Sequence, residues 1–395
     1  MAKAVVTGTG GMTGGGAPYL RWFRTVALAF SLVFAIYAVW SWATAHFWPG
    51  KSDFVSFWAA GRLALSGHPQ LAYDIAAPHA AEQAVGPVGG LLPFSYPPPF
   101  LALVTPFALL PFGAAFFAWV GATLLLYAWA ARRVAPLAYA FAIPAGYINL
   151  LIGQNGFLFS GIFILGLTLV RSNPWIAGMA LGTLVMKPQI ALVLPVAMLA
   201  GREWRVIGGA ACSAAALLLL GLVLFGWSSY QGFFDILPQF VAFMREGRLT
   251  WDEMASPFAL ARSAGVPQQL ALAIHGAIAA VAALVTARAW WLRLDTRVPI
   301  LAAATLLAPP YLLTYDALLL VVPLGWMIRE RRHPYSIAIA WLCALVPIVN
   351  YYTPFAGPNL TSVAAIICLA TLAADARAKR AADKVSGAPA GALAS

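Results

Sequence analysis

Residues 25–45 read TVALAFSLVFAIYAVWSWATA, and this stretch decides the fold. It holds 21 residues without one charged side chain, and a helix needs about 20 apolar residues to cross a bilayer. The run is longer than the apolar part of a typical signal peptide, so we predict a retained transmembrane helix. Apolar runs recur as far as residue 375. Because a backbone in lipid must satisfy its own hydrogen bonds, we expect an all-α polytopic membrane protein.

The composition supports a membrane protein and argues against other classes. The chain has 395 residues, of which 62% are hydrophobic, and a mean hydropathy of +0.81. A soluble domain is about half apolar. The net charge is +11. In a membrane protein, Lys and Arg collect in cytoplasmic loops, and this explains the charge better than a nucleic-acid partner does. Three widely spaced cysteines match neither a disulfide framework nor a metal site.

The distribution of charge predicts the topology. Arg21 and Arg24 precede the first apolar run, which places the N-terminus in the cytoplasm. Counting each later apolar run as a crossing gives about 12 transmembrane helices, with both termini in the cytoplasm. In this topology, 18 of the 24 Lys and Arg residues lie on the cytoplasmic side, and eight of the 13 Asp and Glu residues lie outside. Ten crossings keep the same asymmetry. We prefer twelve, because ten would need a 34-residue span over 137–170, well beyond the roughly 20 residues required.

This topology divides the chain into three parts. Residues 1–20 are expected to form a disordered cytoplasmic N-terminus, residues 21–376 a single transmembrane domain, and residues 377–395 a cytoplasmic tail. Within the domain, residues 227–266 mix apolar and charged side chains and are expected to form an outer loop.

Three pairs of apolar runs are barely long enough to span, and each pair has a polar tip on its outer side. The tips are Gly153-Gln154-Asn155, Lys187-Pro188-Gln189 and Thr314-Tyr315-Asp316. Polar backbone at membrane depth survives only where it lines a cavity, and an ionisable residue there indicates function. We therefore infer an outward-facing polar cavity with Asp53, Lys187 and Asp316 as its charged lining.

The first outer loop contains a predicted helix. Within KSDFVSFWAAGRLALSGHPQLAYD (51–74), Ser52 or Asp53 suits the N-cap and Gly67 suits the position after the last turn. About 14 residues are too few to span, so we expect a short interfacial helix along the outer surface. Its apolar side faces lipid or the protein body. Free backbone N–H groups at the helix start would favour the ionised form of Asp53.

Each polar candidate also has a purely structural reading. Asp53 and Asp316 can be ordinary helix caps, and Gln154 and Asn155 can cap the turn between two helices. Arg62 can contact lipid phosphate or a loop carbonyl. Lys187 can extend its ammonium to the membrane interface.

Four segments in order resemble glycosyltransferase family 87, polytopic enzymes of the C-type glycosyltransferase class. They are SDFVSFWAAGRLALSGHPQLAYD, FSYPPPFLALVTPFALLPF, GQNGFLFSGIF and GMALGTLVMKPQIALVLPVAML. The resemblance covers residues 50–205 and, beyond them, the PPYLLTYD segment. It implies the C-type glycosyltransferase (GT-C) fold and a mannosyltransferase-like activity with a polyprenyl-phosphate sugar donor, on the outer face of the cytoplasmic membrane. The family's general base, an Asp in the first outer loop, corresponds to Asp53.

The expected reaction assigns roles to further residues. Asp53 would take the acceptor proton while a hexose, most simply mannose, moves with inversion to a lipid or glycan hydroxyl. A cation would stabilise the polyprenyl-phosphate leaving group, with Lys187 preferred and Arg62, Arg245, Arg248 and Arg262 as other candidates. The sugar and acceptor would contact Gln154, Asn155, Gln189, Trp58, Tyr96 and Asp316. We expect no metal and no cofactor, since the sequence has no nucleotide-binding motif and no outer Asp-x-Asp pair.

Two other classes of protein fit the hydropathy. A polytopic transporter, or a lipid flippase for envelope-glycan precursors, also uses broken helices with buried charges. A noncatalytic scaffold within an envelope-polysaccharide complex is the third reading. The absence of an internal repeat, and the position of the polar tips at one face, favour the transferase.

Overall fold

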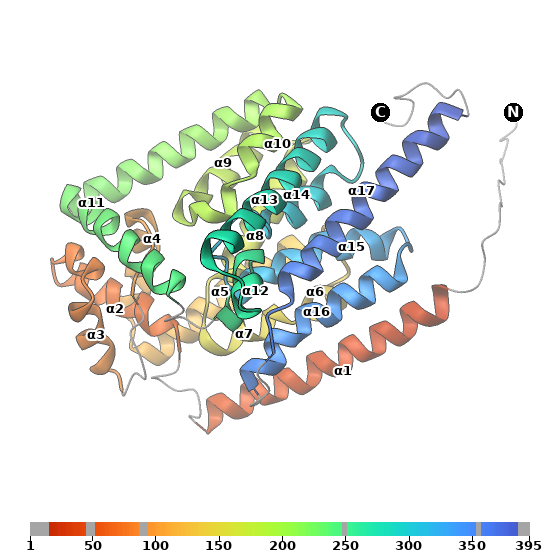
Figure 1. Ribbon diagram of the computed structural model, residues 1–395. Coiled ribbons are helices and arrows are strands. Elements are labelled where there is room, and N and C mark those ends of the chain that lie inside the picture. Colours follow the sequence, from red (N-terminus) through yellow and green to blue (C-terminus); the bar gives the residue numbers. More distant parts are fainter. Residues whose placement is uncertain (1–15, 45–51, 87–92, 247–250, 353–356, 386–395) are drawn as a thin grey trace, which may run out of the picture.

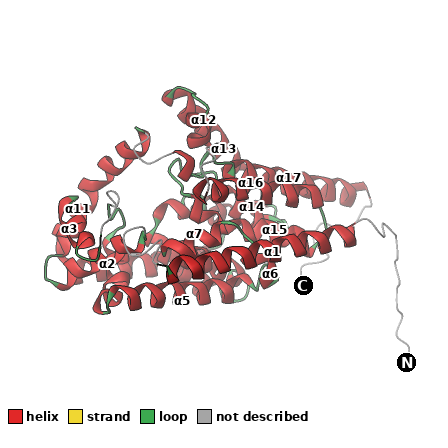
Figure 2. Ribbon diagram, turned by 90° about the horizontal axis from the view of Figure 1, so that it is seen from below, coloured by secondary structure: helices red, strands yellow, loops and turns green. Residues whose placement is uncertain are grey.

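The computed structural model describes residues 16–44, 52–86, 93–246, 251–352 and 357–385 (Figure 1). These residues fold into α-helices and short 3-10 helices, and they contain no β-strand. The prediction of an all-α chain is confirmed for the described part. Figure 2 gives the same helices from below.

Among the residues that the structure describes, five helices are long and apolar enough to cross a membrane, as expected of a multi-pass membrane protein. They are α1 (Gly16–Ala43), α5 (Phe112–Ala131), α11 (Trp204–Arg245), α13 (Gln268–Trp291) and α17 (Thr361–Val385). Shorter apolar helices, among them α16 (Pro334–Tyr352), lie between and beside them. The start of α1 and the end of α17 lie on the same side of the molecule (Figure 1).

Two of the three pairs of short apolar runs are broken at their predicted polar tips, and the third is broken just before its tip, over residues 306–313. The first pair forms α6 (Leu137–Phe141), α7 (Ala145–Ile152) and α8 (Gly156–Leu169). The second forms α9 (Pro174–Gly182), η3 (Thr183–Met186), η4 (Pro188–Ala191) and α10 (Leu194–Gly201). The third forms α14 (Arg297–Thr305), η6 (Thr314–Leu320) and α15 (Val321–Arg329). Residues 153–155 and residue 187 therefore separate helices, whereas residues 314–316 form the first turn of η6.

The predicted first outer loop forms a small helical assembly at the side opposite the end of α17 (Figure 1). It comprises α2 (Phe54–Leu65), η1 (Pro69–Tyr73) and α3 (Ala76–Gln83), and the chain then returns through α4 (Pro98–Val104) and η2 (Thr105–Leu109). As predicted, α2 follows Asp53 and Gly67 adopts a positive φ of 83° after its end. Phe54 and Phe57 are buried against Trp119 of α5, so the apolar side of α2 faces the protein body.

Three boundaries differ from the sequence prediction. α1 already begins at Gly16, so residues 16–20 are helical where disorder was expected. α17 continues to Val385, so the helix includes the first part of the predicted tail. Residues 227–266 were expected to form a loop, but α11 resumes after a sharp break at Gly226 (φ 73°), and η5 (Trp251–Glu253) and α12 (Pro257–Ser263) follow. The expected loop is thus largely helical, because its apolar residues pack in helical register.

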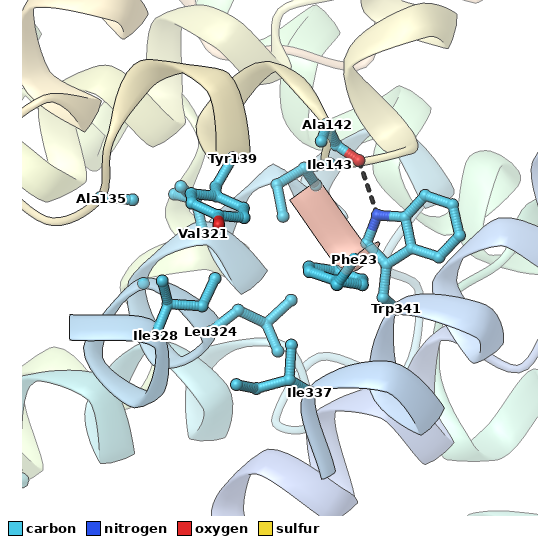
Figure 3. Close-up of a pocket in the computed structure, with 11 residues that line it drawn as sticks. Phe23, Ala135, Tyr139, Ala142, Ile143, Val321, Leu324, Ile328, Ile337 and Trp341 are labelled. Atoms are coloured by element: carbon cyan, nitrogen blue, oxygen red, sulfur yellow. Dashed lines mark hydrogen bonds between the residues drawn. The ribbon is translucent and has the colours of Figure 1, made fainter. Parts of the chain in front are cut away.

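A small apolar gap lies between α1, α6, α15 and α16 (Figure 3). Phe23 sits between Tyr139 and Trp341, and the Trp341 indole N–H donates to the Ala142 carbonyl at 2.7 Å. The gap has a volume of about 10 Å³, roughly what a single water needs. It is a packing defect in an aromatic core, too small for a sugar.

Two glycines allow the turn between α7 and α8 to pack tightly. Gly153 has a φ of 69°, and a Cβ there would lie 2.8 Å from both Phe54 and Phe116. A Cβ at Gly156 would overlap the carbonyl oxygen of Tyr315 and lie 2.5 Å from the Asn149 amide oxygen. Both positions thus require glycine, one for its backbone conformation and both for space.

We predict that Gly156→Ala destabilises the protein by about 1–3 kcal/mol, because the added methyl group overpacks a closed turn. Thermal unfolding of the purified protein in detergent measures the effect. Gly121→Ala is the matched control: Gly121 lies within α5, and a Cβ there meets no heavy atom within 4 Å. Equal unfolding midpoints for the two variants would contradict this packing.

Candidate functional site

The three polar tips meet at a buried ion pair. The Lys187 ammonium donates to Asp316 Oδ1 at 2.5 Å and to Asn155 Oδ1 at 2.8 Å. The side chains of Lys187 and Asp316 are only 1% and 3% exposed. The Lys187 ammonium thereby joins Asn155, which is 32 residues away in the sequence, to Asp316, which is 129 residues away.

Aromatic side chains enclose this ion pair. The Asn155 amide donates to the Tyr96 hydroxyl at 2.7 Å, and the hydroxyls of Tyr96 and Tyr315 are 3.5 Å apart. The Lys187 ammonium also lies 4.6 Å from the centre of the Tyr315 ring, within the range of a cation–π interaction. Tyr96, which precedes α4, therefore joins the first outer loop to the ion pair.

Asp53 connects to this network through amide groups. The Gln154 side-chain N–H donates to Asp53 Oδ2 at 2.7 Å, and the Gln154 amide oxygen accepts from the backbone N–H of Asn155 at 3.2 Å. The turn is held beside Asp53 by two further bonds, from Ser52 Oγ to the Ile152 carbonyl and from the Trp119 indole to the Gly153 carbonyl. Asp53 and Lys187 are thus linked through Gln154 and Asn155, by hydrogen bonds that include the backbone N–H of Asn155.

The Asp53 carboxylate does not cap its helix. Asp53 occupies the N-cap position of α2 but makes no side-chain capping bond, so the reading of Asp53 as an ordinary cap is wrong. Burial raises the pKa of Asp53 to about 6, although the Gln154 hydrogen bond opposes the shift. The expected stabilisation of the charged form by helix N–H groups is therefore outweighed, and this half-buried carboxyl group titrates near neutral pH.

Asp316 and Asn155 also lack their expected capping roles. Asp316 lies inside η6 and accepts from Lys187. Asn155 precedes α8, but its side chain makes no capping bond. Asn149, which the sequence analysis missed, performs that function: its amide oxygen accepts from the Gly156 N–H at 2.7 Å while its amide N–H donates to the Tyr315 carbonyl at 2.9 Å. Asn149 gave no signal because it lies within an apolar run.

Glu82 is a second carboxyl group that the sequence analysis did not single out. It lies on α3, is 1% exposed, and neither carboxyl oxygen has a hydrogen-bond partner. His79 Nδ1 lies 3.6 Å from it. Burial, together with the negative charge of Asp53, raises the pKa of Glu82 to about 8. Glu82 is thus protonated at neutral pH, and Asp53 can ionise without a second negative charge nearby.

The remaining predicted residues lie outside this network. The Trp58 indole donates to the Leu110 carbonyl at 3.0 Å, and Arg62, which is exposed, donates to the Ala108 carbonyl at 3.5 Å. Arg262 donates to the Val266 carbonyl at 2.8 Å and lies over the Trp251 ring. Arg245 is exposed at the end of α11, where it donates to the Gln268 amide oxygen at 2.6 Å. Gln189 is partly exposed on η4, and Arg248 falls outside the described residues.

Within the described residues, no three His, Cys, Asp or Glu side chains gather in a cluster that could hold a metal ion. The residues that meet here instead combine one titrating carboxylate, one paired lysine, two tyrosine hydroxyls and two amides. This set can accept a proton and form hydrogen bonds to a polyol.

Comparison with known families identifies the chain. The model of glycosyltransferase family 87 matches residues 94–323, more than half of the sequence. The chain belongs to glycosyltransferase family 87. It is therefore a membrane glycosyltransferase, and the transferase class inferred from the four segments is confirmed. No curated protein and no solved structure matches it.

The region matched by the family model includes only some of the site residues. It contains Tyr96, Gln154, Asn155, Lys187 and Asp316, and extends well beyond residue 205, but it begins after Asp53, Trp58 and Arg62. The hydrogen bond from Gln154 to Asp53 joins the matched region to the segment outside it.

We predict that Lys187→Met lowers stability by about 3–5 kcal/mol, because Asp316 is then buried without its partner. The double variant Lys187→Met/Asp316→Leu should recover much of the loss. Thermal unfolding in detergent ranks these proteins. In the control variant, Lys379→Met, an exposed pair is broken: Lys379 and Asp295 are 2.6 Å apart with side chains 55% and 67% exposed. Lys379→Met should lower the free energy of unfolding by less than about 1 kcal/mol. A double variant no more stable than Lys187→Met would refute the pairing.

Proposed function

We propose that this family 87 enzyme moves a hexose, most simply mannose, from a polyprenyl-phosphate carrier to a hydroxyl of a lipid or glycan. The reaction would take place on the outer face of the cytoplasmic membrane and invert the anomeric centre, with Asp53 as the general base. The observation that carries the proposal is the state of Asp53: a half-buried carboxylate with one hydrogen bond from Gln154 and no capping role.

A general base works best when its pKa lies near the working pH. An ordinary surface Asp is too weak a base for a sugar hydroxyl, whereas burial brings the pKa of Asp53 to about 6. Gln154 holds one carboxylate oxygen at 2.7 Å, which leaves the other oxygen to receive the acceptor's proton. Displacement from the side opposite the phosphate then gives inversion.

The leaving phosphate needs positive charge beside it. Lys187 is the cation closest in the network, but Asp316 neutralises it and both are buried. In this proposal Lys187 acts on the phosphate only if a bound donor draws the ammonium away from Asp316. Arg245 and Arg262, on the segments that follow the break at Gly226, and Arg62 and Arg248 are the alternative phosphate ligands.

The donor and acceptor contacts follow from the same network. Gln154, Asn155, Gln189 and Asp316 supply amide or carboxylate groups for sugar or acceptor hydroxyls, and the aromatic faces of Tyr96 and Trp58 supply stacking surfaces. Tyr96 and Asn155 are the better placed, since both are joined to Lys187. A lipid-linked donor suits a site built between apolar helices, because the polyprenyl chain can remain in the bilayer.

One observation favours a transporter or lipid flippase as the second candidate. The Lys187–Asp316 pair joins two interrupted helices, an arrangement that membrane transporters use at their substrate sites. Counterflow of a labelled solute or lipid across vesicles, without any glycosidic product, would favour this reading over the transferase.

We predict that Asp53→Asn abolishes hexose transfer without lowering the unfolding midpoint, because the amide keeps its shape but cannot accept the proton. The assay uses the purified full chain in vesicles with polyprenyl-phosphate mannose and a membrane extract as acceptor. Asp74→Asn is the matched control; Asp74 accepts from the backbone N–H groups of Ala76 and Ala77 at the start of α3, and the amide oxygen can keep that role. Undiminished transfer by Asp53→Asn would remove the assigned base.

We predict that transfer by the unmodified enzyme falls as the pH drops through about 6, because protonated Asp53 cannot act as a base. Gln154→Leu removes a hydrogen bond that favours the ionised form, so its rate profile should shift to higher pH. The measurement is kcat/KM between pH 5 and pH 8 on a saturable donor. A flat profile, or a shift to lower pH in Gln154→Leu, would contradict the role of Asp53.

A further inference from the structure

A cavity of about 270 Å³ lies between α13, α14 and α17. Its wall is made largely of aliphatic side chains, including Leu292 and the buried Ile300. Four cations complete the lining: Arg288 from α13, and Arg377, Arg380 and Lys384 from α17. No carboxylate lines the cavity. The space thus has an apolar wall and a cationic rim.

The four cations have no anionic partner within the described part of the chain. Two neighbouring carboxylates pair with other cations: Asp295 with Lys379 at 2.6 Å, and Asp375 with Arg332 at 2.6 Å. Asp383 is also on α17, between Arg380 and Lys384, but does not line the cavity. Three of the four side chains are exposed, and Arg380 is half-buried. Like charges gathered without a counter-charge raise the local potential and attract an anion.

The cavity lies where two membrane-spanning helices become polar. Both α13 and α17 are long and apolar enough to cross a bilayer. Arg288 is the first Lys or Arg along α13, and Arg377 is the first along α17. The position at which a span acquires its first cations marks the headgroup layer of the membrane. The end of α17 is far from α2 and α3 in both Figure 1 and Figure 2, so this cavity is separate from the site around Asp53.

We propose that this cavity binds an anionic phospholipid of the leaflet that meets this end of the molecule. The guanidinium groups of Arg288, Arg377 and Arg380 bind the lipid phosphate, for which their fork of N–H donors is suited, and Lys384 supplies a further charge. The acyl chains lie along the aliphatic wall. Such a site selects phosphatidylglycerol over phosphatidylcholine, because the zwitterionic headgroup carries its own positive charge.

The experiment titrates the purified full chain in detergent with phosphatidylglycerol or phosphatidylcholine and counts bound lipid by native mass spectrometry. We expect the unmodified protein to prefer phosphatidylglycerol by about tenfold, as a site with several cations should. The variant Arg288→Gln/Arg377→Gln/Arg380→Gln/Lys384→Gln should bind both lipids equally while eluting as a monodisperse protein. Its folding is checked by an unchanged unfolding midpoint in phosphatidylcholine.

A matched variant controls for the loss of four positive charges. Arg132→Gln/Arg171→Gln/Arg205→Gln/Arg331→Gln removes the same charge from residues that do not line the cavity, and it should keep the preference for phosphatidylglycerol. Equal lipid preference in the two quadruple variants would overturn the proposal. So would full displacement of phosphatidylglycerol by inorganic phosphate, because the cavity would then bind a free anion without the lipid chains.

Discussion

The buried ion pair between Lys187 and Asp316 is the constraint on which the rest of the site depends. Two charges enclosed by apolar helices are tolerated only when they pair and their remaining hydrogen-bonding capacity is satisfied. Asp316 supplies the counter-charge at 2.5 Å, and Asn155 supplies a second acceptor at 2.8 Å. The three helix interruptions must therefore meet at one point. Gly156 has no side chain, which lets the start of α8 approach the Tyr315 carbonyl closely enough for that meeting.

This arrangement gives the two carboxyl groups different properties. Asp316 faces an ammonium directly and serves as its counter-charge, whereas Asp53 is two amide groups away and faces only the neutral N–H of Gln154. Burial without a cationic partner favours the protonated acid, and for Asp53 this effect exceeds that of its single hydrogen bond. Asp53 is thus the acid placed to exchange a proton, while Asp316 remains engaged with Lys187.

The sequence predicted the breaks more accurately than the roles of the residues at them. Apolar runs too short to span had to be interrupted, and the polar tips located the breaks at 153–155 and 187 correctly. The third break lies at 306–313, before the predicted tip, because Thr314–Asp316 already form the first turn of η6. Asp53 was placed correctly at the start of a helix, but its missing capping bond depends on Gln154, 101 residues away. Glu82 and Asn149 could not be found by periodicity, because their importance comes from burial and from partners on other elements. Residues 227–266 were misjudged because their mixed polarity resembled a loop, although it suits a helix at an interface.

The distribution of charge gives the molecule two different ends. One end carries α2 and α3 (Figure 1), and there burial, together with the negative charge of the half-buried Asp53, raises the pKa of Glu82. At the end where α17 terminates, four cations and no carboxylate line one cavity. In a bilayer, cations bound to phosphate headgroups hold a helix bundle at a fixed depth and orientation. With the proposed lipid-linked donor, fixed depth matters, because donor and base meet only if both lie at the same depth in the bilayer. The cationic cavity and the carboxyl site would thus cooperate through the rigid helices between them, without any direct contact.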